Sequence, residues 1–341
     1  MEKKMTLVKL AKELGLSVST VSKALSDSYE ISSETKKRVL ELAHKYNFKP
    51  NPFASKLRMG KSKFIAVIIP EFNNNFFSVA IDAIHTIAAE KDYNVLVYLT
   101  HEMYLNEISV LSHLEIGQVD GLIMSLCSET KSYDHIEKFH EQTDLPIVFF
   151  DRIAILENFP RIITNNYEIS FQATEHLFSQ GAKNPVYLYS SEFNYINKER
   201  HRGFKDALIR HGLKYTEENA VKCTEDYAIN YSIIYNILTS EKPPDAIFTS
   251  IEKLAIVLYQ VAKDLAIKIP DKLMVVSFSN LRTASLLNPS LTTITQPAFE
   301  MGEESVKLLF KMIEKKFYKN AKDIITVKSK LHLRESTKSI I

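Results

Sequence analysis

Residues 6–27 read TLVKLAKELGLSVSTVSKALSD, and this stretch decides the fold of the first part of the chain. Gly15 divides it, and glycine ends helices because it adopts a positive φ without strain. The second half places small hydroxyl side chains outward, as a helix that enters a DNA groove requires. Apolar side chains recur at helical spacing in both halves, namely Leu7, Leu10, Ala11 and Leu14, then Val21, Ala24 and Leu25. We therefore predict a helix-turn-helix.

A third helix follows, and the first 62 residues as a whole are basic. Ser32 can cap this helix, and its apolar residues repeat the same spacing: Val39, Leu42, Ala43 and Tyr46. Residues 1–62 hold 13 Lys and Arg against 6 Asp and Glu, a net charge of +7, whereas the whole chain carries only +2. A small basic head on a mildly acidic body indicates that the head alone binds a polyanion.

From Lys63 onward, short apolar runs alternate with segments that have the pattern of amphipathic helices. The runs are FIAVII (64–69), VLVYL (95–99), GLIMS (121–125), PIVFF (146–150), VYLYS (186–190), AIFTS and LMVVSF (273–278). Continuous apolar runs separated by helices are typical of parallel sheets that are covered on both faces. With 341 residues, the chain has room for two or three domains. We predict an α-helical head and an α/β body of two doubly wound parallel-sheet lobes.

Several classes of protein are disfavoured by the sequence. It has only 8 glycines and contains no GxGxxG, P-loop, GxSxG or HExxH motif, so we expect no enzyme, no catalytic residue and no cofactor. Cys127 and Cys223 lie far apart, which favours two buried thiols in a reducing compartment over a disulfide framework or a metal site. No stretch approaches 18 apolar residues and no secretory signal opens the chain. We therefore expect a cytoplasmic protein that makes no contact with a membrane.

Motifs in a fixed order then identify a family resemblance. The head carries VSTVSKAL (18–25), ISSETKKRVLELA (31–43) and FKPNPFASKLR (48–58). The body carries IAVIIPEFNNNFFS (65–78), YNVLVY (93–98), VDGLIM (119–124), VFFDR (148–152), ATEHL (173–177), RHRGFKDAL (200–208) and LTTITQP (291–297). Through nearly its whole length the chain resembles the lactose/galactose repressor (LacI/GalR) family of transcriptional regulators.

The resemblance implies a domain order. Residues 1–50 would form the DNA-binding head and 51–62 a hinge helix. The body would have the fold of periplasmic binding proteins, with residues 63–163 and 292–318 in its N-terminal lobe. Residues 164–291 and 319–341 would form its C-terminal lobe.

The resemblance also assigns roles in binding double-stranded operator DNA. Base-reading positions would be Val18, Ser19 and Lys23, and phosphate-binding positions would be Thr6, Ser17, Thr20 and Ser22. Val18 also shares a helix face with Val21 and Leu25, so inward packing stays open for it. In the hinge, Leu57 would wedge into the minor groove beside Ala54, while Lys56 and Arg58 supply positive charge.

In the body, the resemblance places an effector between the two lobes. The positions carried over are Phe72, Phe76, Phe77, Ser125, Asp151, Thr164, Arg200, Tyr227, Ser279 and Gln296. Two alternatives stay open: Asp151 pairs only with Arg152 or Arg161, and the three phenylalanines belong to the core.

The chain departs from the family at two points of this cleft. Ile251-Glu252 stands where the family usually has Asn-Asp, and Ser279-Asn280 stands where it usually has Asp-Asp. Because paired carboxylates bind sugar hydroxyls, their loss beside a retained Arg200 favours an anionic saccharide, or a larger and less polar ligand, over a simple hexose. The other outcome is an ion pair of Arg200 with Asp151 across the lobes.

We therefore expect a transcriptional regulator, most simply a repressor. It would bind a palindromic operator as a homodimer and respond to a carbohydrate or an anionic saccharide. A dimer is favoured because no leucine heptad trails the chain. The alternative is a sugar-binding protein with a vestigial DNA-binding head, which the charge of the head and the intact hinge oppose.

Overall fold

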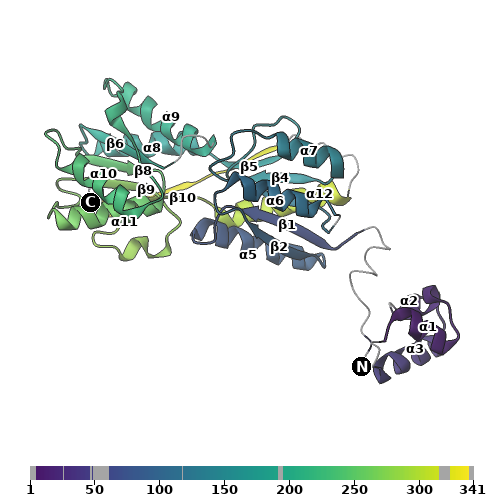
Figure 1. Cartoon of the computed structure of the whole chain (residues 1–341). Helices are drawn as coiled ribbons and strands as arrows, with labels where there is room; N and C mark the ends of the chain where they lie inside the picture. Colours follow the sequence, from purple (N-terminus) through teal and green to yellow (C-terminus); the bar gives the residue numbers. More distant parts are fainter. Residues whose placement is uncertain are drawn as a thin grey trace. The chain divides into compact units, whose positions relative to one another are not determined.

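The computed structural model describes residues 5–25, 27–46, 48, 61–116, 118–190, 195–314 and 323–337. The chain divides into two units, Met1–Lys63 and Phe64–Ile341 (Figure 1). We call the first unit the head and the second the body. The expected hinge residues Ala54, Lys56, Leu57 and Arg58 lie outside the described residues.

The described part of the head contains the helices α1 (Leu7–Leu14), α2 (Val18–Leu25) and α3 (Ser33–Lys45). Thr6 Oγ1 accepts a hydrogen bond from Lys9 N at 3.3 Å and caps α1, and Ser17 Oγ accepts one from Thr20 N at 3.0 Å and caps α2. Gly15 ends α1 with a φ of 66°. The core of the head includes Leu10, Ala11, Val21, Ala24, Val39 and Ala43. The predicted helix-turn-helix is confirmed.

The N-terminal lobe of the body is built on a parallel six-stranded sheet with the order β11-β5-β4-β3-β1-β2. Its strands are β1 (Phe64–Ile69), β2 (Asn94–Leu99), β3 (Leu122–Met124), β4 (Ile147–Phe150), β5 (Arg161–Thr164) and β11 (Ile324–Val327). One face packs against α5 (Asn75–Glu90) and α12 (Ala298–Glu314), and the other against α6 (Tyr104–Leu114) and α7 (Asp134–Thr143). The central strands are apolar throughout because both faces of the sheet are buried.

The C-terminal lobe repeats this architecture with the order β12-β10-β9-β8-β6-β7, in which only β12 is antiparallel to its neighbour. Its strands are β6 (Pro185–Tyr189), β7 (Ala220–Lys222), β8 (Ala246–Thr249), β9 (Met274–Phe278), β10 (Thr292–Thr295) and β12 (Lys330–His332). The helices α8 (Asn166–Ser179) and α9 (Tyr195–Arg210) cover one face, and α10 (Tyr227–Leu238) and α11 (Glu252–Asp264) cover the other. Short 3-10 helices span Glu217–Asn219 and Arg282–Leu286. Two doubly wound lobes are thus confirmed.

Each lobe contains a helix pair that approaches closely at a glycine. A Cβ atom on Gly302 of α12 would lie 2.3 Å from the carbonyl oxygen of Ala80 on α5. A Cβ atom on Gly203 of α9 would lie 2.3 Å from the carbonyl oxygen of Tyr167 on α8. Both positions require glycine because the obstructing atoms belong to backbone.

The described chain crosses between the lobes after β5, after β10 and after β11. Two of these crossings correct the expected lobe borders. We expected the chain to return to the N-terminal lobe at residue 292, but β10 pairs with β9 of the C-terminal lobe. We expected it to leave that lobe at residue 319, but β11 pairs with β5. Both strands are four residues long, and a short apolar pattern does not show which sheet a strand joins.

Among the described residues, no helix is long and apolar enough to cross a membrane. The same residues contain no group of three or more His, Cys, Asp or Glu that is placed to hold a metal ion. Cys127 and Cys223 are free and buried.

Candidate functional site

A cleft lies between the two lobes of the body, and part of its empty volume of about 790 Å³ is open to solvent. Residues that follow β1, β2 and β4 line it from the N-terminal lobe, and residues that follow β6, β8 and β9 line it from the C-terminal lobe. Open α/β folds bind ligands at the carboxyl ends of their parallel strands. The cleft is therefore the candidate ligand site of the body.

Asp151 stands at the end of β4 with its side chain in this cleft. Its backbone is left-handed, with a φ of 58°, a conformation that non-glycine residues adopt at a cost and often at binding sites. The residue is 5% exposed, and its Oδ1 accepts a hydrogen bond of 2.8 Å from Gln296 Nε2. Within the described ranges, Asp151 forms no ion pair with Arg152 or Arg161, so that alternative interpretation is wrong.

Arg200 is the buried cation on the opposite side of the cleft. Its Nε donates to Asn166 Oδ1 at 2.9 Å, its Nη1 donates to the carbonyl of Ser250 at 2.8 Å, and its guanidinium lies 3.6 Å from the centre of the Phe278 ring. Its Nη2 has no hydrogen-bond partner among the described residues. Burial lowers the pKa of Arg200 to about 10, and the charge of Asp151 offsets part of that shift. The alternative of an Arg200–Asp151 ion pair is wrong, because no such pair forms in the part of the chain that the structure describes.

Three phenylalanine rings contribute to the apolar part of the lining. Phe76 and Phe77 lie in the first turn of α5, are 3% and 1% exposed, and pack edge-to-face at 5.2 Å. Phe76 also stacks on Phe150 of β4 at 6.2 Å. Phe76 and Phe77 therefore belong both to the core and to the lining, and Phe278 forms the wall beside Arg200.

The cleft brings together six of the ten expected positions, namely Phe76, Phe77, Asp151, Arg200, Ser279 and Gln296. The other four do not line it. Phe72 and Tyr227 are 49% and 53% exposed, whereas Ser125 and Thr164 are buried at 0% and 4%. The resemblance placed these four by sequence position alone, and their side chains lie elsewhere.

Sequence reasoning missed a set of charged side chains in the lining of the cleft, all of them at least partly exposed. The set comprises Glu71, Glu102, Arg152, Glu225 and Lys253. Glu102 accepts both hydrogen bonds of Arg152 Nη1, at 2.7 and 2.8 Å, and a third from Ser128 N at 2.7 Å. Burial raises the pKa of Glu102, but Arg152 and Ser128 outweigh burial and lower it overall. Only Arg152 had a visible signal, because it ends the quoted motif VFFDR.

Glu252 corrects the expectation that the second lobe lacks an acidic group. Its Oε2 accepts hydrogen bonds from Ser279 Oγ at 2.8 Å and from Asn280 N at 3.1 Å. Residues from the two sequence departures, Glu252 on one side and Ser279 and Asn280 on the other, are therefore hydrogen-bonded to each other. The described lining holds the carboxylates Glu71, Glu102, Asp151, Glu225 and Glu252 against the cations Arg152, Arg200 and Lys253. By number of side chains, the described lining is therefore more acidic than basic.

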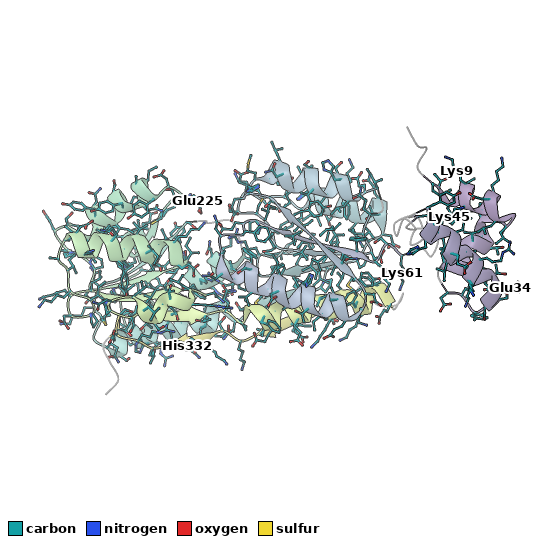
Figure 2. The ribbon with its side chains drawn as sticks, turned by 90° about the horizontal axis from the view of Figure 1, so that it is seen from below. Lys9, Glu34, Lys45, Lys61, Glu225 and His332 are labelled. Atoms are coloured by element: carbon teal, nitrogen blue, oxygen red, sulfur yellow. The ribbon has the colours of Figure 1, made fainter. Side chains whose placement is uncertain are left out.

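The head presents the polar side of its second helix to solvent. Ser19 and Lys23 are exposed, and Lys23 forms an ion pair with Glu30. Lys9 and Lys45 are also exposed on the head (Figure 2). The four positions expected to bind phosphate have local partners or are half-buried. Thr6 and Ser17 cap helices, Thr20 Oγ1 lies 2.8 Å from Ser17 Oγ, and Ser22 is half-buried. Val18 is half-buried and packs against the core of the head.

A basic helix-turn-helix head followed by a two-lobed body with a ligand cleft defines a ligand-controlled transcription regulator. Residues 6–51 match the family described as bacterial regulatory proteins of the lacI family. Residues 62–333 match the family described as periplasmic binding proteins and the sugar binding domain of the LacI family. The chain belongs to the LacI family, whose members are transcription regulators rather than enzymes.

Relatives resemble the chain over almost its full length. It is 30% identical to a ribose operon repressor of Halalkalibacterium halodurans, with 98% of this chain and 97% of the relative covered. It is 26% identical to a catabolite control protein A of Priestia megaterium, with 98% and 99% covered. The solved structure of a lac repressor dimer bound to operator and the anti-inducer ONPF is similar in fold, with a TM-score of 0.83, 19% identity and 99% and 100% of the chains covered.

Proposed function

We propose that this regulator is a repressor that binds a palindromic operator as a homodimer. In this assignment, a carbohydrate bound in the cleft changes the affinity of the head for the operator. The protein works in the cytoplasm beside its DNA and catalyses no reaction. Helix-turn-helix dimers bind two half-sites related by their own symmetry, which supports the dimer and the palindrome together.

The proposal that the ligand is a sugar rests on one acceptor, Asp151, and one donor, Arg200, in the lining of the cleft. Asp151 uses one carboxylate oxygen for Gln296, and Arg200 uses two of its three nitrogens for Asn166 and Ser250. A hydroxyl group both donates and accepts hydrogen bonds, so neighbouring hydroxyls of a sugar satisfy the second oxygen of Asp151 and Nη2 of Arg200. The rings of Phe76, Phe77 and Phe278 face the apolar side of such a ligand.

The charge balance of the lining supports a neutral sugar over an anionic one. An added phosphate or carboxylate would meet five carboxylates and three cations, and two of these cations are already paired with Glu102 and Glu71. The name of the relative that is 30% identical, a ribose operon repressor, also supports a sugar as the effector.

Ser19 and Lys23 are the base-reading residues in this proposal, and Lys23 must leave Glu30 to reach a base edge. Val18 contributes to packing. Thr6, Ser17, Thr20 and Ser22 contact phosphates, which fixes the register on DNA without reading sequence. In the hinge, Leu57 and Ala54 enter the minor groove, and Lys56 and Arg58 contact the backbone.

Two measurements on the full-length protein test the proposal. Calorimetric titration with ribose, glucose, glucose 6-phosphate and glucuronic acid should show binding of a neutral sugar and weaker binding of the charged analogues. Selection from random duplexes, with and without that sugar, should enrich a sequence with twofold symmetry. Tightest binding of a charged analogue would refute the ligand class, and a failure to enrich any duplex would refute the repressor assignment.

A further inference from the structure

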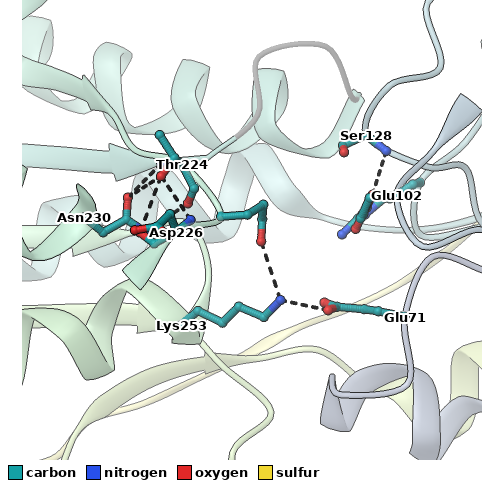
Figure 3. Close-up of polar contacts among 9 residues, drawn as sticks. Glu71, Glu102, Ser128, Thr224, Asp226, Asn230 and Lys253 are labelled. Atoms are coloured by element: carbon teal, nitrogen blue, oxygen red, sulfur yellow. Dashed lines mark hydrogen bonds and ion pairs between the residues drawn. The ribbon is translucent and has the colours of Figure 1, made fainter. Parts of the chain in front are cut away.

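An ion pair joins the two lobes on the solvent side of the cleft. Lys253 Nζ lies 2.7 Å from Glu71 Oε2 and 3.6 Å from Glu225 Oε2 (Figure 3). Glu71 follows β1 in the N-terminal lobe, whereas Lys253 lies in the first turn of α11 and Glu225 precedes α10 in the C-terminal lobe. Only the contact with Glu71 therefore bridges the lobes, and the contact with Glu225 stays within one lobe.

Both partners of the bridging pair lie next to regular elements of their own lobes. Next to Lys253, Glu252 fixes the start of α11 through its hydrogen bonds with Ser279 and Asn280. Glu71 is held between β1 and α5, whose N-cap Asn74 accepts a hydrogen bond of 2.9 Å from Phe76 N. The distance between Lys253 and Glu71 consequently follows the separation of the lobes, and a small opening of the cleft breaks the pair.

The Glu225 contact is longer, at 3.6 Å, and stays within the C-terminal lobe, which makes it a useful comparison. Thr224 N donates to Asn230 Oδ1 at 2.8 Å (Figure 3). Asp226 caps α10 by accepting a hydrogen bond from Ile229 N at 2.9 Å. These bonds hold the segment that carries Glu225 against its own lobe. Opening the cleft therefore leaves the distance between Glu225 and Lys253 unchanged.

The electrostatic surroundings keep Lys253 charged. Burial lowers the pKa of Lys253, but the hydrogen bond and charge of Glu71, together with Glu225 and Glu102, outweigh burial and raise it. Glu102 is already bound to Arg152. The Lys253 side chain is 45% exposed and that of Glu71 is 20% exposed, so the pair is partly shielded from water.

We propose that Lys253 and Glu71 form a latch by which the protein's own residues favour the closed cleft, before any effector contributes. This inference rests on the proposed function, in which a sugar binds in the cleft. The apparent affinity of a ligand that binds the closed cleft rises in proportion to the fraction of protein molecules that are already closed. Partly exposed ion pairs are weak, so the expected shift in the closed-to-open ratio is about two- to fivefold. Screening by salt should reduce it.

The test measures the distance between the lobes of the full-length protein by electron spin resonance. Spin labels are attached to cysteines introduced at Glu141 on α7 and Ser232 on α10, both of which are exposed. Labelled chains are diluted with unlabelled chains, so that only distances within one chain contribute. The native cysteines are buried and burial raises the pKa of both thiols to about 11, so they react slowly with the label.

Lys253→Met and Glu71→Gln should each reduce the closed fraction by the stated factor. The matched control Glu225→Gln should leave the distance distribution unchanged. High salt should reduce the closed fraction of the wild type and leave the closed fraction of Lys253→Met unchanged. An unchanged distribution in Glu71→Gln, or an equal change in Glu225→Gln, would overturn the proposal. No sugar or DNA enters this readout, so its failure is distinct from a failure of the proposed function.

Discussion

Replacing Asp151 with asparagine separates the contribution of this residue to ligand binding from its contribution to folding. The asparagine keeps an oxygen that can accept from Gln296 Nε2, the bond that Asp151 makes at 2.8 Å. It also tolerates the left-handed backbone, where φ is 58°, better than most residues do. It removes a buried charge that forms no ion pair within the described chain. We therefore expect the free energy of unfolding to change by less than about 1 kcal/mol.

Ligand affinity should respond very differently. A hydrogen bond from a sugar hydroxyl to a charged carboxylate contributes about 1.5–3 kcal/mol, which corresponds to a loss of about 10- to 150-fold in Kd when asparagine presents an amide donor instead. Calorimetric titration of the variant with the neutral sugar that binds the wild type best, and chemical unfolding of the same sample, measure the two quantities together.

Asp151→Ala is the matched control, because it lacks the acceptor for Gln296 and has no polar side chain to stabilise the left-handed backbone. This variant should lose both affinity and about 1–3 kcal/mol of stability. Wild-type affinity in Asp151→Asn would show that the carboxylate does not contact the ligand. A loss of stability as large as that of Asp151→Ala would show that its role is structural.

Three further predictions concern packing and DNA binding. Gly302→Ala should destabilise the body by about 1–3 kcal/mol in chemical unfolding, because its Cβ would lie 2.3 Å from a carbonyl oxygen on α5 and the cost of overpacking exceeds the gain of about 1 kcal/mol in helix propensity. The control Glu300→Ala, at an exposed position of the same helix, should change stability by less than about 0.5 kcal/mol. Equal effects of the two variants would contradict the packing argument. Lys23→Ala should reduce discrimination at one symmetric base pair by about 1–3 kcal/mol, measured on operators with single substitutions; a uniform loss over all sequences would mean that Lys23 contacts only phosphate. Operator affinity should fall by roughly 10³–10⁵ between 50 and 200 mM salt if the dimer makes six to ten phosphate contacts, and a flat salt response would favour a vestigial head.

The sequence predicts the fold well wherever burial leaves a periodic pattern. The segment FIAVII became β1 with the predicted bounds, because a strand covered on both faces must be apolar throughout. The predicted cap at Ser32 and the turn at Gly15 follow from local chemistry in the same way. The placement of β10 and β11 could not be predicted in the same way, because the partner of a short strand depends on distant parts of the chain.

The candidate site was only partly predictable for a related reason. Asp151 and Arg200 lie at positions that the family resemblance marks, but their partners Gln296, Asn166 and Ser250 are 145, 34 and 50 residues away. Lys253 and Glu71 are 182 residues apart, and each alone has the sequence signal of an ordinary surface charge. Phe72 and Tyr227 show the converse error, because position in a motif does not determine where an exposed side chain points.

The last described segment of the chain, residues 323–337, contributes one strand to each lobe. β11 joins the first sheet and β12 the second, and between them Ser329 N donates to Asn165 Oδ1 at 2.8 Å, at the first crossing between the lobes. A ribosome therefore finishes the head some 270 residues before either sheet has all its strands. A nascent chain thus carries a complete helix-turn-helix well before it has a sensor able to control it.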